Sequence, residues 1–258
     1  MKNRIIEPSR SPWRAQIVVS KDPTGKHKKR LCIDYSTTVN LYTHADAYPL
    51  PRIDILINDL AHYKYYSTFD LKSAYHQIGI REEDRQKTAF EANGKLYHFR
   101  RVPFGVTNGV AVFQRVVDAL VEEEELEGVF VYLDNVTIAG RTQNEHDKNV
   151  KKFLEVAKRK NLTLNENKTI SSVTSLDVLG YRVEFGTIKP DPERMKPLEK
   201  LLPPENKKAM QRLLGMFAYY SKWIPNFSEE AYVLFKATEF PLGEVELAAL
   251  ERLKFLLK

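Results

Sequence analysis

The sequence is poor in cysteine and histidine and has no long apolar run. One cysteine, Cys32, occurs in 258 residues, which excludes an internal disulfide and a zinc site built from several thiolates. The histidines are scattered, and neither H-E-x-x-H, G-x-G-x-x-G nor a complete phosphate-binding loop is present. The strongest apolar stretch, Val129–Leu133, is far shorter than the roughly 18 residues of a membrane span. These absences argue against a zinc enzyme, a dinucleotide-binding enzyme and a membrane protein.

What is present is the composition of an ordinary globular protein. Hydrophobic residues make up 43% and charged residues 29%, which excludes a wholly disordered chain. The length suits one large domain or two to three small ones. No apolar segment follows the charged start, Met1–Pro8, so we predict no secretory signal. With the single cysteine, this predicts a reducing, intracellular location.

The net charge of +6 is mild, but the basic residues are clustered. Lysine and arginine outnumber acidic residues in segments 21–30, 146–168 and 189–212, whereas the acids gather at Glu122–Glu125. A solvated surface explains any one cluster taken alone. A polyanionic partner would give the clusters a common explanation.

Strand-like and helical segments follow one another without internal repeats. The expected strands are 16–19, 30–35, 65–70, 129–133, 136–139 and 178–185. Helical spacing of apolar residues recurs in 53–60, 108–126 and 146–157, and again near the end in 245–257. Proline pairs separate a basic N-terminal part, a strand-rich middle and a helical C-terminal part. Because strands and helices do not alternate strictly and hairpins are expected, the predicted fold class is α+β.

Two aspartates are placed where carboxylates could meet. Asp70 ends the strand 65–70, and Asp134 lies between two apolar strands. Such carboxylates would repel unless a divalent cation lay between them, and Mg²⁺ takes one or two carboxylates plus substrate phosphates. Each residue alone also has a plainer interpretation. Asp134 and Asn135 suit a two-residue hairpin turn, and Asp70 suits a helix cap.

Short motifs follow one another from Ser11 to Phe235. They are SPW (11–13), LCIDY (31–35), YPLPRID (48–54), FDLKSAYHQI (69–78), KTAF (87–90), PFGVTN (103–108), FQR (113–115), YLDN (132–135), LGY (179–181), LGMFAYY (214–220) and NFS (226–228). In this order and spacing the chain resembles the reverse transcriptase of gypsy-type long-terminal-repeat retrotransposons and, more distantly, of retroviruses. One such motif would be weak evidence for the family, but the whole set in the same order and spacing is specific evidence.

The resemblance implies a right-hand polymerase fold of fingers, palm and thumb, with an antiparallel palm sheet packed on helices. The implied boundaries are fingers 1–56 and 81–107, palm 57–80 and 108–187 with the catalytic hairpin, thumb and following helix 188–236, and 237–258 as the start of a connection toward a ribonuclease H domain. No ribonuclease H, integrase or protease segment is present, so we expect a fragment, a trimmed reading frame or a processed piece of a Pol polyprotein.

The resemblance also implies an RNA-directed DNA polymerase. It would use deoxynucleoside triphosphates to extend a primer on an RNA or DNA template, in the cytoplasm or a retroelement particle. Asp70 and Asp134, with Asn135, would hold two Mg²⁺ or Mn²⁺ ions that activate the primer 3′-hydroxyl and steady the leaving pyrophosphate. The backbone carbonyl of Leu71 would complete one metal shell.

Other site residues follow from the same resemblance. They are Arg30 and Lys21 for the incoming triphosphate, Tyr75 as the gate against a ribose 2′-hydroxyl, Lys168 as the proton donor to pyrophosphate, and Leu179, Gly180 and Tyr181 as the primer grip. Taken singly, a lysine or arginine is also explained as a surface charge, and an aromatic as a core residue.

The sequence departs from the family at the catalytic hairpin, where Asn135 replaces the second aspartate. The change removes a negative charge beside the expected metal ions, so we expect weakened metal affinity. Val110, Ser36 and Thr169 are lesser departures from a proline, an arginine and a cysteine. Asn135, Val110 and the missing ribonuclease H favour one alternative, a catalytically impaired nucleic-acid-binding remnant. The other alternative is a fragment without a stable role, whose C-terminal stretch would expose an apolar face.

Overall fold

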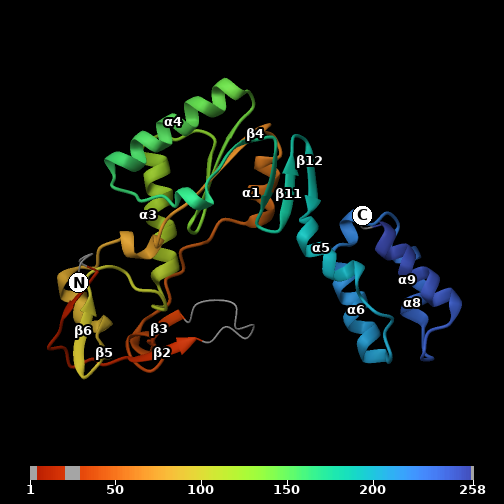
Figure 1. Ribbon diagram of the computed structural model, residues 1–258, viewed down its shortest axis with the longest axis horizontal. Helices are drawn as coiled ribbons and strands as arrows, with labels where there is room; N and C mark the ends of the chain where they lie inside the picture. Colours follow the sequence, from red (N-terminus) through yellow and green to blue (C-terminus); the bar gives the residue numbers. More distant parts are fainter. Residues whose placement is uncertain (1–4, 21–29, 257–258) are drawn as a thin grey trace. The chain divides into compact units, whose positions relative to one another are not determined.

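The computed structural model describes residues 5–20 and 30–256, and the chain forms two compact units (Figure 1). The first unit comprises Met1–Leu56 and Tyr63–Thr174, and the second comprises Ile57–His62 and Ser175–Lys258. Helix α1 (Ile53–Leu60) contributes residues to both.

The first unit is built on a four-stranded antiparallel sheet with the order β7-β8-β4-β9. Its strands are β7 (Val129–Tyr132), β8 (Asn135–Gly140), β4 (Tyr65–Asp70) and β9 (Ile170–Val173). Strand β4 is internal and pairs with β8 along its whole length, from Tyr65 opposite Gly140 to Asp70 opposite Asn135. This register brings the carboxyl end of β4 to the hairpin between β7 and β8.

Two amphipathic helices, α3 (Gly109–Glu123) and α4 (Gln143–Arg159), pack on this sheet and provide its core. The buried side chains come from the predicted apolar stripes and include Phe113, Val117, Leu120, Phe153 and Ala157. The same stripes reach the surface at their edges, where Val116 and Leu154 are exposed. Helix α4 begins after Thr142, whose side chain accepts a hydrogen bond from the backbone N–H of Glu145, as an N-cap does.

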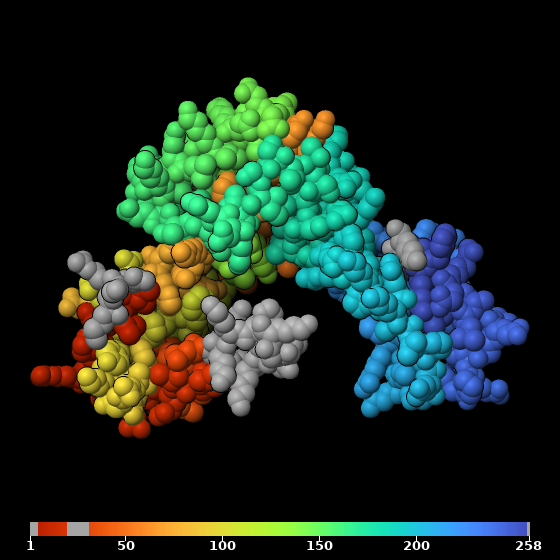
Figure 2. Space-filling view, in the orientation of Figure 1, coloured from red at the N-terminus to blue at the C-terminus, as the bar shows by residue number. Residues whose placement is uncertain are grey.

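Two smaller sheets complete the first unit. One has the order β1-β6-β5, formed by Ile6–Pro8, Lys95–Phe99 and Phe90–Ala92, so that residues far apart in sequence lie side by side (Figure 2). In the other, β2 (Gln16–Ser20) pairs with β3 (Arg30–Asp34). Ala15, Tyr35, Phe90 and Phe99 form their shared core. The short helix α2 (Glu82–Arg85) precedes β5.

The second unit has a three-stranded antiparallel sheet followed by helices. The strands are β10 (Ser175–Val178), β11 (Tyr181–Glu184) and β12 (Thr187–Pro190), and the helices are α5 (Pro192–Glu199), α6 (Lys207–Tyr219), α7 (Phe227–Glu230), α8 (Tyr232–Lys236) and α9 (Glu244–Leu256). The helical core is apolar and includes Leu213, Phe217, Leu234, Leu250 and Leu253.

These elements confirm the predicted α+β class and correct two strands. The expected strand 178–185 is two strands, because Leu179 and Gly180 form a turn with φ values of 53° and 89°. The expected strand 129–133 ends at Tyr132, and its partner begins at Asn135. Within residues 5–20 and 30–256, no helix combines the length and apolar character needed to cross a membrane. The division into fingers, palm and thumb segments stays a prediction.

Candidate active site

The register of the central sheet places the two predicted aspartates on neighbouring chain segments. Asp70 is the last residue of β4 and lies opposite Asn135, the first residue of β8. The backbone N–H of Leu71 donates to the carbonyl oxygen of Asp134 at 2.8 Å. Backbone pairing therefore fixes the end of β4, which carries Asp70, to the hairpin turn that carries Asp134. Two carboxylates that bind the same ion need such a fixed relative position.

The hairpin turn consists of Leu133 and Asp134, between β7 and β8. Tyr132 pairs with Asn135, so the interpretation of Asp134 and Asn135 as the two turn residues is wrong. Leu133 has a φ of 55°, a left-handed conformation that favours glycine in such turns. A leucine here costs conformational free energy, and such strain persists only where surrounding contacts hold it.

Gln114 of α3 supplies one of those contacts. It is 0% exposed, and its side-chain oxygen accepts the backbone N–H of Leu133 at 2.9 Å. Its amide nitrogen donates to Asp118 Oδ1 at 2.8 Å and to the carbonyl oxygen of Val131 at 3.3 Å. Both ends of the amide are thus engaged, and the turn is fastened to the buried face of α3.

Both carboxylate oxygens of Asp70 have partners in the structure. Lys168 Nζ lies 2.8 Å from Oδ2, and Asn165 Nδ2 donates to Oδ1 at 3.2 Å. The Asp70 side chain is 12% exposed, whereas that of Lys168 is 63% exposed. The next helical turn begins at Ala74, after Ser73, so the interpretation of Asp70 as a helix cap is wrong.

Tyr75 lies close enough to Asp134 to respond to its charge. Burial, and secondarily the negative charge of Asp134, raise the pKa of the Tyr75 phenol above its usual value. The Tyr75 ring contacts Phe113 at a centroid distance of 5.4 Å and Phe104 at 5.0 Å, both edge to face. The structure therefore brings Asp70, Asp134, Tyr75 and Lys168 into one region.

The donor set fits a divalent cation. Asp70 and Asp134 would supply carboxylates, and Asn135, which is exposed, would supply an amide oxygen. Mg²⁺ suits such a set because it takes few protein ligands and fills its shell with water and phosphate oxygens. In the described part of the chain, no group of three His, Cys, Asp or Glu residues could hold a metal ion. An ion at this site would therefore need ligands from substrate or solvent.

The remaining predicted site residues lie elsewhere or beyond the described residues. Lys21 and the Arg30 side chain fall outside the description, although the Arg30 backbone begins β3 opposite Ser20. Leu179 and Gly180 form the β10–β11 turn of the second unit, and Tyr181 begins β11. The Tyr181 ring lies 5.9 Å from that of Trp223, and Lys222 Nζ lies 5.0 Å from the Tyr181 centroid.

Two residues at the site, Gln114 and Asn165, have roles that the sequence alone does not predict. Gln114 belongs to the quoted FQR motif, but only the fold shows that it holds the turn. Asn165 precedes Lys168 in an Asn-rich loop, and its backbone N–H also donates to the carbonyl oxygen of Asp70 at 2.8 Å. No sequence signal indicates this role, because Asp70 lies 95 positions from Asn165 along the chain.

Comparison with known proteins agrees with this architecture. The chain is similar to the foamy virus protease–reverse transcriptase solved with double-stranded DNA, with a TM-score of 0.81 at 23% identity over 99% of this chain and 45% of that one. A second foamy virus protease–reverse transcriptase structure, with an RNA/DNA hybrid, gives a TM-score of 0.76 at 22% identity over 98% of this chain and 34% of that one. The fold is the right-hand polymerase fold.

Sequence comparison is more specific. The chain is 36% identical to the retrovirus-related Pol polyprotein from transposon opus of Drosophila melanogaster, over 92% of this chain and 24% of that protein. It is 35% identical to the corresponding polyprotein from transposon gypsy of the same organism, over 88% and 22%. The chain thus spans about a quarter of the length of these curated relatives. Residues 19–183 match the model of the family described as reverse transcriptase (RNA-dependent DNA polymerase). The chain belongs to the reverse transcriptase family of retrotransposon Pol polyproteins.

Proposed function

We propose that the chain is an RNA-directed DNA polymerase domain that extends a primer on an RNA or DNA template. The single observation that carries this proposal is the pairing of Asp70, at the end of β4, with the hairpin that bears Asp134. The two similar foamy virus structures were solved in complex with double-stranded DNA and with an RNA/DNA hybrid, which supports a template–primer as the partner here. Deoxynucleoside triphosphates would be the second substrate.

Reverse transcriptases generally use divalent metal ions, and the residues that would hold two Mg²⁺ or Mn²⁺ ions here are Asp70, Asp134 and Asn135, with the Leu71 carbonyl. When bound, these ions would lower the pKa of the primer 3′-hydroxyl and stabilise the charge that develops on the phosphates. The protein's own contribution is rigid placement. The β4–β8 pairing fixes one carboxylate, and Gln114 fixes the turn that carries the other.

Lys168 would have two successive roles in this proposal. Before substrate binds, its ammonium group neutralises Asp70 at 2.8 Å. When cations and a triphosphate enter, the exposed lysine would turn from Asp70 toward the phosphates and donate a proton to the leaving pyrophosphate. Its long, exposed side chain can make that move without disturbing the sheet.

Tyr75 would set the sugar specificity. Its ring is held edge to face by Phe104 and Phe113, which leaves little freedom to move aside for a ribose 2′-hydroxyl. Burial, and secondarily the charge of Asp134, raise the pKa of Tyr75, and this secondary effect of Asp134 supports a place for Tyr75 beside the incoming nucleotide. Arg30 and Lys21 would bind the triphosphate, and Leu179, Gly180 and Tyr181 would grip the primer.

A second candidate function is nucleic-acid binding without catalysis. Asn135 favours it, because an amide replaces a charge at the strand end opposite Asp70. The retained Asp70, Asp134 and Tyr75 favour the polymerase. Metal-dependent nucleotide incorporation separates the two functions.

The decisive experiment is primer extension on an RNA template with Mg²⁺ or Mn²⁺. We expect the wild-type chain to extend the primer and Asp134→Ala to lose about 100-fold or more in rate, because several kcal/mol of transition-state stabilisation depend on the bound ions. Asp59→Ala removes an exposed carboxylate in α1 and is the matched control, with an unchanged rate. Wild-type protein that is folded and binds primer–template but extends nothing would refute the polymerase and favour the binder.

A further inference from the structure

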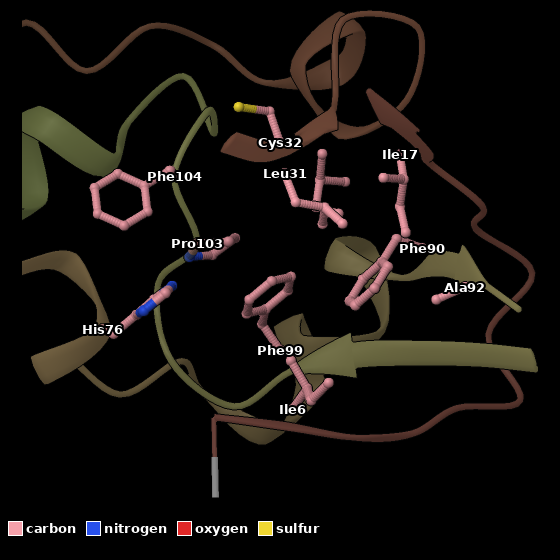
Figure 3. Close-up of a pocket in the computed structure, with 11 residues that line it drawn as sticks. Ile6, Ile17, Leu31, Cys32, His76, Phe90, Ala92, Phe99, Pro103 and Phe104 are labelled. Carbon is pink, nitrogen blue, oxygen red and sulfur yellow. The ribbon is translucent and has the colours of Figure 1, made fainter. Parts of the chain in front are cut away.

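A large apolar pocket lies in the first unit, between the β2–β3 hairpin and strands β5 and β6 (Figure 3). Its volume is about 770 Å³, within the usual range of small-molecule sites. The lining includes Ile17, Leu31, Phe90, Phe99, Phe104 and His76. Phe90 and Phe99 are buried at its wall, whereas Leu31 and Phe104 are 65% and 52% exposed, so the pocket is open at these residues.

The lining carries almost no charge. Among the residues that the structure describes, no Asp, Glu, Lys or Arg lines the pocket, and the titratable side chains of the lining are those of His76 and Cys32. Burial lowers the pKa of the His76 imidazole below its usual value, so the ring is neutral at pH 7. A site of this composition disfavours a triphosphate, whose charges would lose their hydration without gaining a cation.

His76 is the polar group that would orient a ligand. Its ring stacks on Phe99 at 6.0 Å and meets Phe104 edge to face at 5.2 Å. No described residue makes a hydrogen bond with either ring nitrogen of His76, and Figure 3 shows the ring beside the aromatic lining. A neutral imidazole offers one N–H donor and one acceptor.

We propose that this pocket is a binding site for an uncharged, planar aromatic molecule with one hydrogen-bonding group that pairs with the His76 imidazole. Flat rings suit the Phe90, Phe99 and Phe104 side chains, because offset and edge-to-face aromatic contacts are favourable. The volume accommodates a ligand of drug size, larger than a single ring system.

The pocket is linked to the proposed nucleotide site through Phe104. The Phe104 ring contacts His76 inside the lining and Tyr75 outside it, the latter at 5.0 Å. An occupant that displaces Phe104 removes one of the two rings that hold Tyr75. Ligand binding is thus expected to slow nucleotide incorporation, and this consequence, unlike binding itself, rests on the proposed function.

Binding is tested with 5-fluoroindole, observed by ¹⁹F NMR. We expect its resonance to shift and broaden with the wild-type chain, with a dissociation constant of about 0.1–1 mM for so small a probe. Ala92→Phe places a ring in the pocket and should weaken binding at least tenfold. Ala45→Phe makes the same change at an exposed position outside the lining and should bind as the wild type does. Ile17→Trp fills the pocket from the β2 side and replaces Ala92→Phe if that variant does not melt cooperatively.

Two further readouts locate the ligand. Cys32 is the single cysteine, so bound 5-fluoroindole should slow its alkylation by iodoacetamide several-fold in the wild type and not in Ala92→Phe. His76→Phe keeps an aromatic ring but removes the hydrogen bond. This variant should weaken the binding of 5-fluoroindole severalfold. The binding of 1-fluoronaphthalene, which has no hydrogen-bonding group, should stay unchanged.

The proposal is overturned if 5-fluoroindole does not bind the folded wild-type chain at millimolar concentration, or if the filling variants bind it equally well. If His76→Phe weakened the binding of both probes equally, the proposed hydrogen bond between the ligand and His76 would be refuted. Primer extension that the ligand inhibits equally in wild type and Ala92→Phe would overturn the link through Phe104. Because binding and alkylation need no polymerase activity, an inactive chain would refute the proposed function and leave this test intact.

Discussion

At the scale of single residues, the amide of Asn135 is the most consequential departure from the family. It lies opposite Asp70 in the sheet register and is exposed, so an aspartate fits there without burial cost. We expect Asn135→Asp to tighten Mn²⁺ binding about tenfold, because a further unit charge near a dication contributes about 1 kcal/mol or more even in a well-solvated site. Electron paramagnetic resonance of Mn²⁺ with the protein alone measures this. Asn144→Asp makes the same change at an exposed position of α4 and is the control, with an unchanged Mn²⁺ affinity.

Lys168 gives a second prediction at this scale. Because its ammonium group pairs with Asp70, a metal ion must compete with it. Lys168→Met should tighten Mn²⁺ binding two- to fivefold, a small effect since the lysine is largely exposed. The same variant should slow extension if Lys168 protonates pyrophosphate. Lys95→Met, at an exposed position of β6 outside the basic clusters, is the control. Weaker Mn²⁺ binding in Lys168→Met would contradict the competition.

The candidate site was only partly predictable from residue patterns. Asp70 and Asp134 could be named because motifs flank them and because strand ends suit metal ligands. Asn165 and Gln114 could not be assigned roles, since each acts on a residue 95 or 19 positions away. Such roles follow from tertiary packing, which a motif does not encode.

At the scale of elements, the β7–β8 hairpin depends on helix α3. Gln114 is fully buried, and its loss would leave the Leu133 N–H unpaired beside a left-handed backbone. We expect Gln114→Leu to lower the free energy of unfolding by about 1–3 kcal/mol. Urea unfolding measures the change. Gln16→Leu, on an exposed position of β2, should lie within about 0.5 kcal/mol of the wild type. Equal stability of both variants would show that Gln114 does not hold the turn.

Helices and strands were well predicted where the hydrophobic periodicity extended over many residues. They were poorly predicted where a turn lacked the glycine or asparagine that usually marks it. Strand β4 has the predicted bounds, and α3 and α4 cover the predicted stripes. The turns at Leu133 and Leu179 were missed because leucine rarely adopts positive φ. Both lie in segments assigned to the proposed catalytic machinery, where surrounding contacts can stabilise unfavoured conformations.

At the scale of the whole molecule, the basic clusters predict salt-sensitive, sequence-independent binding of a primer–template duplex. If about four phosphates are neutralised, affinity should fall roughly 100-fold between 50 and 200 mM salt. The double variant Lys207→Glu and Lys208→Glu, at the exposed start of α6, should weaken binding and flatten this dependence. Lys95→Glu lies outside the clusters and is the control. Fluorescence anisotropy of a labelled primer–template measures the affinity and its salt dependence. A salt-independent affinity would argue against phosphate contacts.

The place of β4 inside the central sheet also bears on how the chain folds as it is synthesised. Both partners of β4 come later in the sequence, β8 beginning at Asn135 and β9 at Ile170. At about 5–20 residues per second, the ribosome needs roughly 4 to 14 s after Asp70 to reach the end of β8. During that interval the apolar side chains of β4, Tyr66 and Phe69 among them, have no sheet to enter. The nascent chain therefore passes through a stage that exposes an unpaired strand, at which a chaperone that shields it would raise the yield of folded protein.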